Sequence, residues 1–110
     1  HTRAKSYDTF ACVGPWMVAG LDPSALRVQA RVNGETRQDG NTSDMIFPVP
    51  MLVAFISRVM TLLPGDIITT GTPPGVGMGM KPPQYLKPGD RMRIGIDGLG
   101  EQNQKVVRDK

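Results

Sequence analysis

An alternating segment followed directly by a glycine turn constrains the fold of this chain more than any other feature. Apolar residues occupy every second position from Leu26 to Val32, which is the period of a half-buried strand. Asn33-Gly34 comes next, and this dipeptide is typical of a type I′ turn, whose two central residues both take positive φ. The more polar residues 35–39 therefore predict a return strand near the edge of a sheet.

The tripeptide Pro-Gly-Asp occurs at 64–66 and again at 88–90, and each copy predicts a turn that begins a strand. The two strands expected after these turns are 67–70 and 91–96. Asp97-Gly98 then predicts a second tight hairpin, with its return strand within residues 99–107. Residues 1–20 predict an extended loop that enters a short strand.

One segment has helical spacing. Pro50 suits the first turn of a helix, where a missing N–H costs nothing, and the helix must end before Pro64-Gly65. We expect 11 to 13 residues, about three turns. The apolar residues that share one helical face are Met51, Leu52, Phe55, Ile56, Val59 and Met60.

The composition agrees with a turn-rich fold. Gly (13) and Pro (10) make up 23 of 110 residues, which favours many turns and short strands over a helical bundle. The length allows at most one small domain. The predicted class is therefore mainly β with one short helix (α+β).

Charge and hydropathy argue against two classes of partner. The 13 basic and 10 acidic residues give a net charge of +3, but the basic residues are scattered, whereas phosphate backbones require a concentrated basic face. No apolar run approaches the roughly 20 residues of a membrane span. We expect no nucleic-acid partner, no membrane partner and a cytoplasmic location.

Cys12 is the only cysteine and therefore cannot form an intramolecular disulfide. No Cys/His cluster exists for zinc, and both facts indicate a reducing compartment. We expect Cys12 to be a small buried hydrophobic residue.

The glycine-rich loop 71–80 is the first candidate for chemistry. It is not a dinucleotide loop, because Lys81-Pro82-Pro83 cannot continue the helix that such a loop must open. Gly71-Thr72 offers backbone N–H groups and a hydroxyl that could receive a carboxylate. The alternative is a structural crossover that needs positive φ, and spacing alone does not separate the two.

Other candidates are weaker. A Ser-His-Asp triad is improbable, because the only histidine is His1. Asp66, Asp90 and Asp97 favour an ordinary turn role, while Asn41–Asp44 could cap the following helix, fix a loop at a site, or do both. Lys5 could form a surface pair with Asp8 or face an anionic substrate.

Several motifs, taken in order, resemble one family. They are Lys5-Ser6-Tyr7-Asp8-Thr9-Phe10, Gly14-Pro15-Trp16, Val32-Asn33-Gly34-Glu35, the run from Arg37 to Phe47, Leu63-Pro64-Gly65-Asp66, the run from Thr70 to Gly77, and Lys87-Pro88-Gly89-Asp90. The chain resembles the C-terminal part of the catalytic domain of the fumarylacetoacetate hydrolase family, in its bacterial 2-oxo acid hydrolase, isomerase and decarboxylase branch.

The resemblance implies a mixed β-sandwich roll, a homodimer, and a divalent cation (Mg²⁺, alternatively Mn²⁺ or Ca²⁺) that binds a 2-oxo acid substrate. It implies that Lys5 is the active-site lysine, which would stabilise developing enolate or oxyanion charge. Thr9 matches a position near the metal in some members. Gly71 and Thr72 match the loop that binds the substrate carboxylate, which favours the functional interpretation of that loop.

The chain departs from the family in its metal ligands. The family uses a Glu-x-Glu pair and an Asp upstream of the lysine motif, whereas the only glutamates here are Glu35 and Glu101. We therefore expect residues 1–110 to be a partial catalytic domain whose N-terminal portion, with the metal ligands, lies upstream of His1. These 110 residues alone are then expected to be inactive.

Two enzymatic functions follow from the resemblance, and a third interpretation, from another class of protein, stands beside them. The first is hydrolysis of the C–C bond of acylpyruvate-type 2-oxo acids, similar to fumarylacetoacetate or fumarylpyruvate, in aromatic or amino-acid catabolism. The second is isomerisation or decarboxylation of a carboxymethyl-hydroxymuconate-type catabolite. The third is a truncated, non-catalytic β domain that only dimerises.

Overall fold

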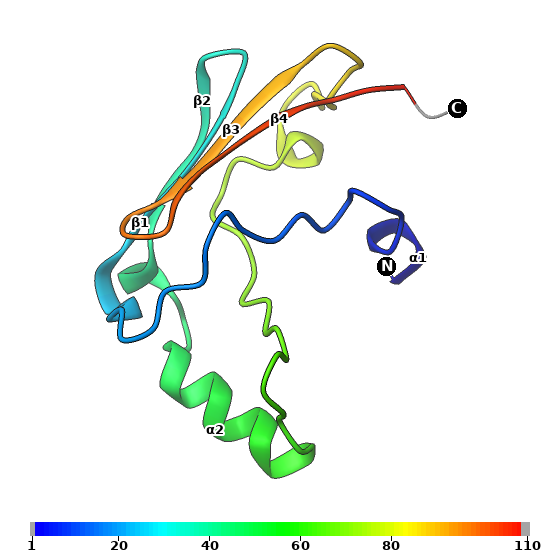
Figure 1. Ribbon diagram of the computed structural model, residues 1–110. Helices are drawn as coiled ribbons and strands as arrows, with labels where there is room; N and C mark the ends of the chain where they lie inside the picture. The colour runs from blue at the N-terminus through cyan, green and yellow to red at the C-terminus, as the bar shows by residue number, and fades with distance from the viewer. Residues whose placement is uncertain (1, 109–110) are drawn as a thin grey trace.

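The computed structural model describes residues 2–108, which form one antiparallel sheet, one main helix and long connecting segments (Figure 1). The elements in chain order are α1 (Thr2–Lys5), η1 (Pro23–Ala25), β1 (Arg27–Val32), β2 (Glu35–Asn41), η2 (Thr42–Asp44), α2 (Val49–Val59), η3 (Gly77–Gly79), β3 (Arg91–Ile96) and β4 (Gly100–Lys105), where η marks a single 3₁₀ turn. The α+β class expected from the sequence is confirmed.

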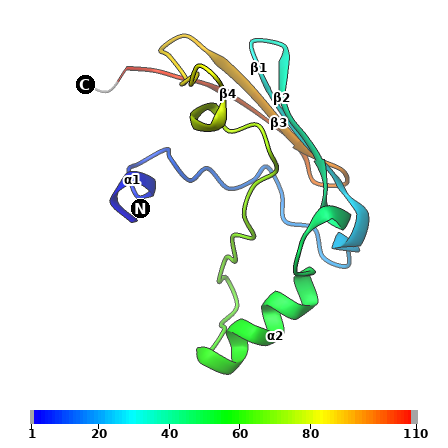
Figure 2. The same ribbon diagram turned by 180° about the vertical axis from the view of Figure 1, so that it is seen from behind.

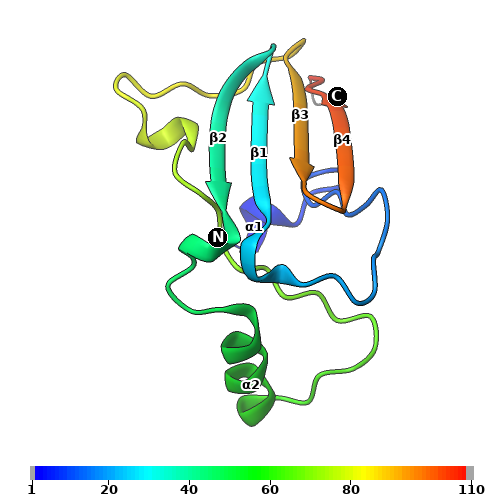
Figure 3. The same ribbon diagram turned by 90° about the vertical axis from the view of Figure 1, so that its left-hand side faces the viewer.

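The four strands lie in the order β2-β1-β3-β4, and every neighbouring pair is antiparallel (Figure 3). Asn33 (φ 52°) and Gly34 (φ 85°) form the turn between β1 and β2, as the sequence predicts. β2 lies at one edge of the sheet, as its polar composition indicates. Asp97-Gly98 begins the second hairpin, between β3 and β4.

The sheet has one apolar and one charged face. Residues directly opposite each other in an antiparallel pair share a face, and Val28, Ala30 and Val32 of β1 lie opposite Ile96, Ile94 and Met92 of β3. The other face carries two ion pairs, Arg27 with Asp39 and Arg93 with Glu101. Residues of the loop 75–87 lie beside the apolar face, because they line one pocket together with Ala30, Val32 and Ile94.

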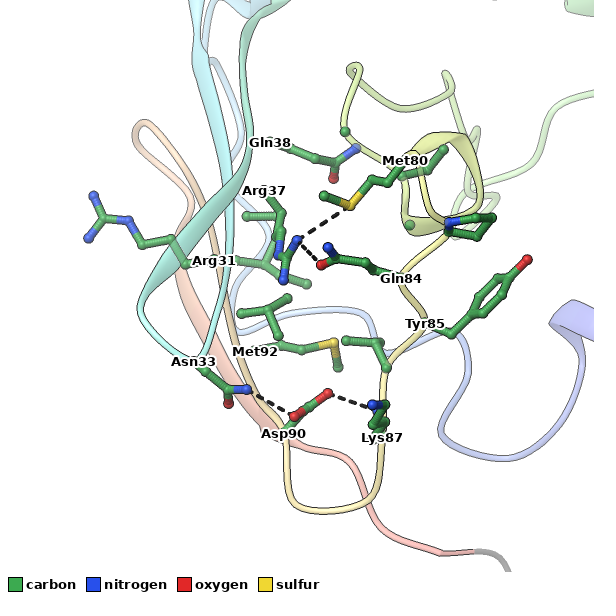
Figure 4. Close-up of a pocket in the computed structure, with 18 residues that line it drawn as sticks. Arg31, Asn33, Arg37, Gln38, Met80, Gln84, Tyr85, Lys87, Asp90 and Met92 are labelled. Carbon is green, nitrogen blue, oxygen red and sulfur yellow. Dashed lines mark hydrogen bonds between the residues drawn. The ribbon is translucent and has the colours of Figure 1, made fainter.

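A β-bulge in β2 changes which way Arg37 points. Ala30 lies opposite Gln38, but Arg31 lies opposite Thr36, so that Arg37 is the extra residue of β2. Without the bulge, Arg37 and Gln38 would point to opposite faces. With it, both side chains line the space beside the apolar face (Figure 4).

The two Pro-Gly-Asp turns have the same hydrogen bonds. Asp66 Oδ2 accepts from the backbone N–H of Leu63 at 2.8 Å, and Asp90 Oδ2 accepts from that of Lys87 at 2.8 Å. Each aspartate N–H in turn donates to the carbonyl of the same partner, at 3.0 Å in both turns. The turn role expected for both aspartates is confirmed.

The strand expected at 67–70 is wrong. The residues directly after the second turn form β3, but residues 67–70 pair with no strand in the described part of the chain, and Ile67 is 66% exposed. A strand needs a neighbour to receive its backbone hydrogen bonds. The local β-rich pattern is present, but the described residues supply no neighbouring strand.

The N-terminal segment also differs from the expectation. Instead of an extended loop entering a strand, residues 2–5 form the short helix α1, and the following residues are irregular; His1 lies outside the described residues. Further along, the Gln102 side-chain amide donates to the carbonyl of Gly14 at 2.6 Å, and a Cβ on Gly100 would lie 2.6 Å from the Trp16 indole nitrogen. Residues 14–16 therefore cover the apolar face at β4.

Cys12 is exposed, which corrects the expectation of burial. Its Sγ donates to the carbonyl of Thr9 at 3.2 Å, and no described element packs over it. The hydrophobic character of residues 10–18 thus does not translate into burial within this chain.

Helix α2 has the expected length, 11 residues, but lies apart from the sheet (Figures 1 and 2). Asn41–Asp44 do not cap it, because Pro48 precedes its first residue and no side chain makes a cap hydrogen bond. Thr42–Asp44 form η2 instead, and Asn41 caps this turn, because its Oδ1 accepts from the N–H of Ser43 at 3.0 Å. Thr42 Oγ1 accepts from the N–H of Leu26 at 2.8 Å.

None of the side chains of residues 2–108 is buried. Phe55 of α2 is 66% exposed, and Phe10, Trp16 and Ile46 are also exposed. Within residues 2–108, no helix has the length and hydropathy needed to cross a bilayer. Burial of apolar area is the dominant favourable term in folding, and these residues leave much of their apolar area exposed.

Candidate functional site

The glycine-rich loop lies against β2 in a way that only glycine allows. Gly75 has φ 114°, and a Cβ at this residue would lie 1.8 Å from the carbonyl oxygen of Arg37. A Cβ on Gly77 would lie 1.8 Å from the carbonyl oxygen of Gln84, whose N–H donates to Gly77 O at 2.9 Å. The first approach holds the loop against the edge strand β2, and the second holds two parts of the loop, Gly77 and Gln84, against each other.

Gln38 joins this loop to the sheet. Its side-chain nitrogen donates to the hydroxyl oxygen of Thr72 at 2.7 Å and to the carbonyl oxygen of Pro73 at 2.7 Å. Next to it, Gly40 leaves room for the Pro73 ring, since a Cβ on Gly40 would lie 2.9 Å from Pro73 Cβ. Thr72, one of the residues expected to bind substrate, is therefore held by β2.

Gly71 takes φ 101°, and a Cβ added there would meet no atom within 4 Å. Positive φ thus accounts for the glycine at 71, and close packing accounts for those at 75 and 77. The structural role of the loop glycines is confirmed, and carboxylate binding by Gly71 and Thr72 stays a prediction.

Lys5 is the last residue of α1 and is exposed. α1 and the loop that contains η3 lie on the same side of the sheet (Figures 1 and 2). Within residues 2–108, no hydrogen bond joins Lys5 or Thr9 to Gly71 or Thr72. The roles of the two halves of the expected site therefore stay predictions.

Thr9 has an unusual backbone. Its φ is 68°, in the left-handed region that a β-branched residue rarely adopts. Residues held in this region cost of order 1–3 kcal/mol and cluster at functional sites. This geometry is independent of the sequence motif and also points to the Lys5–Thr9 segment.

A cavity of about 670 Å³ lies between the apolar face and the loop from 75 to 87 (Figure 4). The Arg37 side chain, 21% exposed, projects into it, donating from Nη1 to Gln84 Oε1 at 2.7 Å and to Met80 Sδ at 3.3 Å. Its Nη2 lies 3.3 Å from Glu35 Oε2. Arg37 thus has partners on both sides of the cavity and acts as a brace between β2 and the loop.

The carboxylates of the described residues serve the fold. Asp39 accepts two hydrogen bonds from Arg27, at 2.7 and 2.8 Å, and this pairing lowers the pKa of Asp39 to about 2. A hydrogen bond from the Asn33 amide, and then one from the Lys87 N–H, lowers the pKa of Asp90. Asp22 accepts from the N–H of Ser24, which lowers its pKa too.

These side chains do not fit a metal ion. No group of three or more His, Cys, Asp or Glu side chains that could hold one occurs among residues 2–108. The acidic residues that come close to other groups bind arginines, turn N–H groups or amides instead.

Sequence reasoning missed two residues, Arg37 and Gln38, whose side chains hold the glycine-rich loop. Both lie within the run from Arg37 to Phe47 that carries the family resemblance. Their place in that run is the signal by which the sequence could have identified them. Their partners, Gln84 and Thr72, lie 47 and 34 residues away, so no local pattern identifies the contacts.

With this geometry described, comparison with known proteins identifies the class. The model of the fumarylacetoacetate (FAA) hydrolase C-terminal domain matches residues 1–107. The chain therefore belongs to the fumarylacetoacetate hydrolase family, and its fold is that of the family's C-terminal domain.

Solved structures agree with this assignment. A fumarylacetoacetate hydrolase from Exiguobacterium antarcticum is 46% identical, with a TM-score of 0.93 over 97% of this chain and 39% of that one. A 2-hydroxyhepta-2,4-diene-1,7-dioate isomerase from Mycobacterium marinum is 48% identical, with a TM-score of 0.86 over 96% of this chain and 39% of that one.

A third structure contains bound groups. The maleylpyruvate hydrolase of Sphingobium sp. SYK-6, in complex with manganese(II) and pyruvate, is 46% identical, with a TM-score of 0.84 over 94% of this chain and 38% of that one. The solved structures that this chain matches thus include both hydrolases and isomerases.

A curated relative from Burkholderia multivorans, named provisionally as a hydrolase, is 54% identical over 106 residues. The match covers 93% of this chain but 38% of that protein. The chain thus spans about two fifths of the length of the curated relatives it matches, and any activity of a whole protein lies beyond what these residues show.

Proposed function

We propose that these residues are the C-terminal part of the catalytic domain of a cytoplasmic, homodimeric hydrolase that cleaves the C–C bond of acylpyruvate-type 2-oxo acids. The reaction adds water across that bond and yields pyruvate and a carboxylic acid. The observation that carries the proposal is the 46% identity to a maleylpyruvate hydrolase described in complex with pyruvate.

Two segments supply the chemistry in this proposal. Gly71 and Thr72 bind the substrate carboxylate through a backbone N–H and a hydroxyl, which are donors suited to an anion. Lys5 stabilises the negative charge that develops on the pyruvyl enolate as the C–C bond breaks, a role that suits a cation held close to the reacting atoms. Thr9 positions this segment through its left-handed backbone.

The divalent cation of the proposal, Mg²⁺ or alternatively Mn²⁺ or Ca²⁺, is bound by residues upstream of His1. Two facts support this placement: residues 2–108 contain no suitable group of ligands, and the manganese complex belongs to a family member of which this chain covers only 38%. The exposed apolar surface of α2 supports an upstream portion that packs against it.

The second candidate is an isomerase or decarboxylase of a carboxymethyl-hydroxymuconate-type dicarboxylate. It is favoured by the 48% identity to a 2-hydroxyhepta-2,4-diene-1,7-dioate isomerase. The same two segments would serve, because isomerisation also forms an enolate next to a carboxylate. The two candidates differ in whether a C–C bond is hydrolysed.

The experiment uses the full-length protein with Mg²⁺ or Mn²⁺ and acetylpyruvate or fumarylpyruvate, and, for the second candidate, 5-carboxymethyl-2-hydroxymuconate or 2-hydroxyhepta-2,4-diene-1,7-dioate. Hydrolysis releases pyruvate, which lactate dehydrogenase measures through NADH oxidation, with loss of the enol absorbance of the substrate. An isomerase changes that absorbance without releasing pyruvate, and a decarboxylase releases carbon dioxide.

Lys5→Ala should lower kcat at least a hundredfold, the scale of removing one electrostatic stabiliser of a transition state. The matched control is Lys105→Ala, at the end of the outer strand β4. Full activity of Lys5→Ala would remove Lys5 from the site. Absence of all three activities from the full-length protein would leave the non-catalytic, dimerising domain as the remaining interpretation.

A further inference from the structure

The hydrogen bonds of Gln38 decide which way its amide group faces. Its nitrogen lies 2.7 Å from the carbonyl oxygen of Pro73, and a carbonyl oxygen can only accept a hydrogen bond. The NH₂ group, and not the amide oxygen, must therefore face the loop. The same NH₂ group lies 2.7 Å from Thr72 Oγ1.

This orientation decides the role of the Thr72 hydroxyl. An amide NH₂ has two N–H donors and does not accept, so Thr72 Oγ1 must be the acceptor of the second N–H. The hydroxyl proton of Thr72 is then not used by Gln38. It remains available for an acceptor in front of the loop, such as an oxygen of a carboxylate.

We propose that Gln38 is a positioning residue that makes the Thr72 hydroxyl a dedicated hydrogen-bond donor to the carboxylate of a 2-oxo acid. The proposal rests on the proposed function, because it assigns Thr72 the same ligand. The side chain acts from β2, where the pairing of Gln38 with Ala30 places it on the apolar face of the sheet, beside the loop. The close approach of Gly75 to Arg37 O and of Pro73 to Gly40 keeps the loop at this distance.

The first arm of the experiment removes the two donors. In the full-length protein, Gln38→Met should raise the inhibition constant of pyruvate and the KM of the substrate about tenfold, the scale of losing one hydrogen bond to a charged group. The value of kcat should change less than threefold, since the reacting bond lies away from the carboxylate. Thr72→Val should raise the inhibition constant of pyruvate to a similar extent.

The second arm measures coupling. If Gln38 acts through the Thr72 hydroxyl, Gln38→Met should change the inhibition constant of pyruvate less than twofold in the Thr72→Val background. Two results overturn the inference and leave the proposed function standing. One is a fully additive loss of pyruvate affinity in the double variant. The other is an unchanged inhibition constant in Gln38→Met when Thr72→Val raises that constant. An unchanged inhibition constant and KM in Thr72→Val overturn the inference together with the carboxylate-binding role of Thr72, whereas absence of turnover by the unsubstituted full-length protein overturns the proposed function.

The third arm inverts the hydrogen bond. A carboxylate in Gln38→Glu accepts the proton of Thr72 and should weaken pyruvate binding further, with partial recovery below pH 5, where a protonated carboxyl group donates again. The recovery should be absent in the Thr72→Val background. No recovery in Gln38→Glu, or an equal recovery in both backgrounds, which repulsion between the carboxylate and pyruvate would cause, overturns the inference. Asn103→Asp, which adds the same charge at an exposed position of β4, is the matched control and should leave pyruvate binding unchanged.

Discussion

The Asn33 side-chain nitrogen donates to Asp90 Oδ1 at 2.9 Å and thereby joins two turns that lie 57 residues apart in the chain. Asn33 Oδ1 also accepts from the N–H of Arg91 at 2.9 Å, and the Asn33 N–H donates to Arg91 O at 2.8 Å. The turn after β1 and the turn before β3 thus hold one end of the central strand pair.

Asn33→Gly should destabilise the protein by about 1–2 kcal/mol, because it removes two side-chain hydrogen bonds while glycine still adopts the turn. The pKa of Asp90 should rise, since the Asn33 amide is the first cause of its lowering. Chemical denaturation measures the first effect and NMR titration of the Asp90 carboxyl measures the second. An unchanged Asp90 pKa would show that the Lys87 N–H alone maintains it.

The ion pair between Arg27 and Asp39 predicts a specific acid sensitivity. The folded pKa of Asp39 is about 2, below the ordinary value of 3.8, so this group stabilises the fold above pH 3.8 and the stabilisation is lost as the pH falls towards 2. Asp39→Asn should remove that part of the pH dependence. Unfolding curves between pH 2 and pH 5 measure this pH dependence. The comparison variant is Glu101→Gln, which removes the other ion pair on the charged face, that of Arg93 with Glu101.

Gly75→Ala should disrupt the glycine-rich loop. The new Cβ would lie 1.8 Å from Arg37 O, so the loop must move away from β2 and release Thr72 from Gln38. We expect the KM for the 2-oxo acid to rise at least tenfold, with a stability loss of a few kcal/mol.

The matched control is Gly89→Ala. Gly89 has a similar φ of 100°, but an added Cβ would meet no atom within 4 Å, so this variant carries only the backbone strain, about 1–2 kcal/mol. Equal effects of the two substitutions on KM would show that positive φ, and not close packing against β2, explains Gly75.

Thr9 allows backbone strain to be separated from hydroxyl chemistry. Thr9→Gly relieves the strain at φ 68°, whereas Thr9→Ala keeps most of it, and both remove the hydroxyl. The Gly variant should be more stable than the Ala variant by up to about 1 kcal/mol. Turnover should fall in both if the hydroxyl acts at the site. A stable Thr9→Gly variant with full activity would show that the hydroxyl has no role at the site and would leave Thr9 only the backbone role.

Local patterns in the sequence were sufficient for the hairpin at Asn33-Gly34, the two Pro-Gly-Asp turns and α2, because each depends on residues within a few positions of one another. They were insufficient for residues 67–70 and for Cys12. Pairing and burial are properties of the neighbouring elements, and the described residues place none beside these segments.

The candidate site shows the same division. Lys5 and Thr72 were identified by motif, whereas Gln38 was not, because a polar residue in an edge strand gives no local signal of a contact 34 residues away. The hydrogen-bond partners of Gln38 became evident only when the sheet and the loop were placed together.

The 110-residue chain by itself should be an incomplete folding unit. Apolar side chains of α2, among them Met51, Phe55 and Val59, are exposed, and exposed apolar patches of this kind need a covering partner. The isolated chain should bind a hydrophobic dye such as ANS and unfold without a sharp transition. It should also show no turnover of acetylpyruvate with Mg²⁺, because residues 2–108 contain no group of ligands for the ion.

The full-length protein is the control, since its additional residues should cover α2, prevent dye binding and restore cooperative unfolding. Phe55→Ser separates the two states, because it removes an exposed ring from the isolated chain but a buried one from the full-length protein. It should therefore reduce dye binding by the isolated chain and destabilise the full-length protein by about 3–5 kcal/mol. Turnover by the isolated chain above background, or a full-length protein indifferent to Phe55→Ser, would contradict this division of the fold.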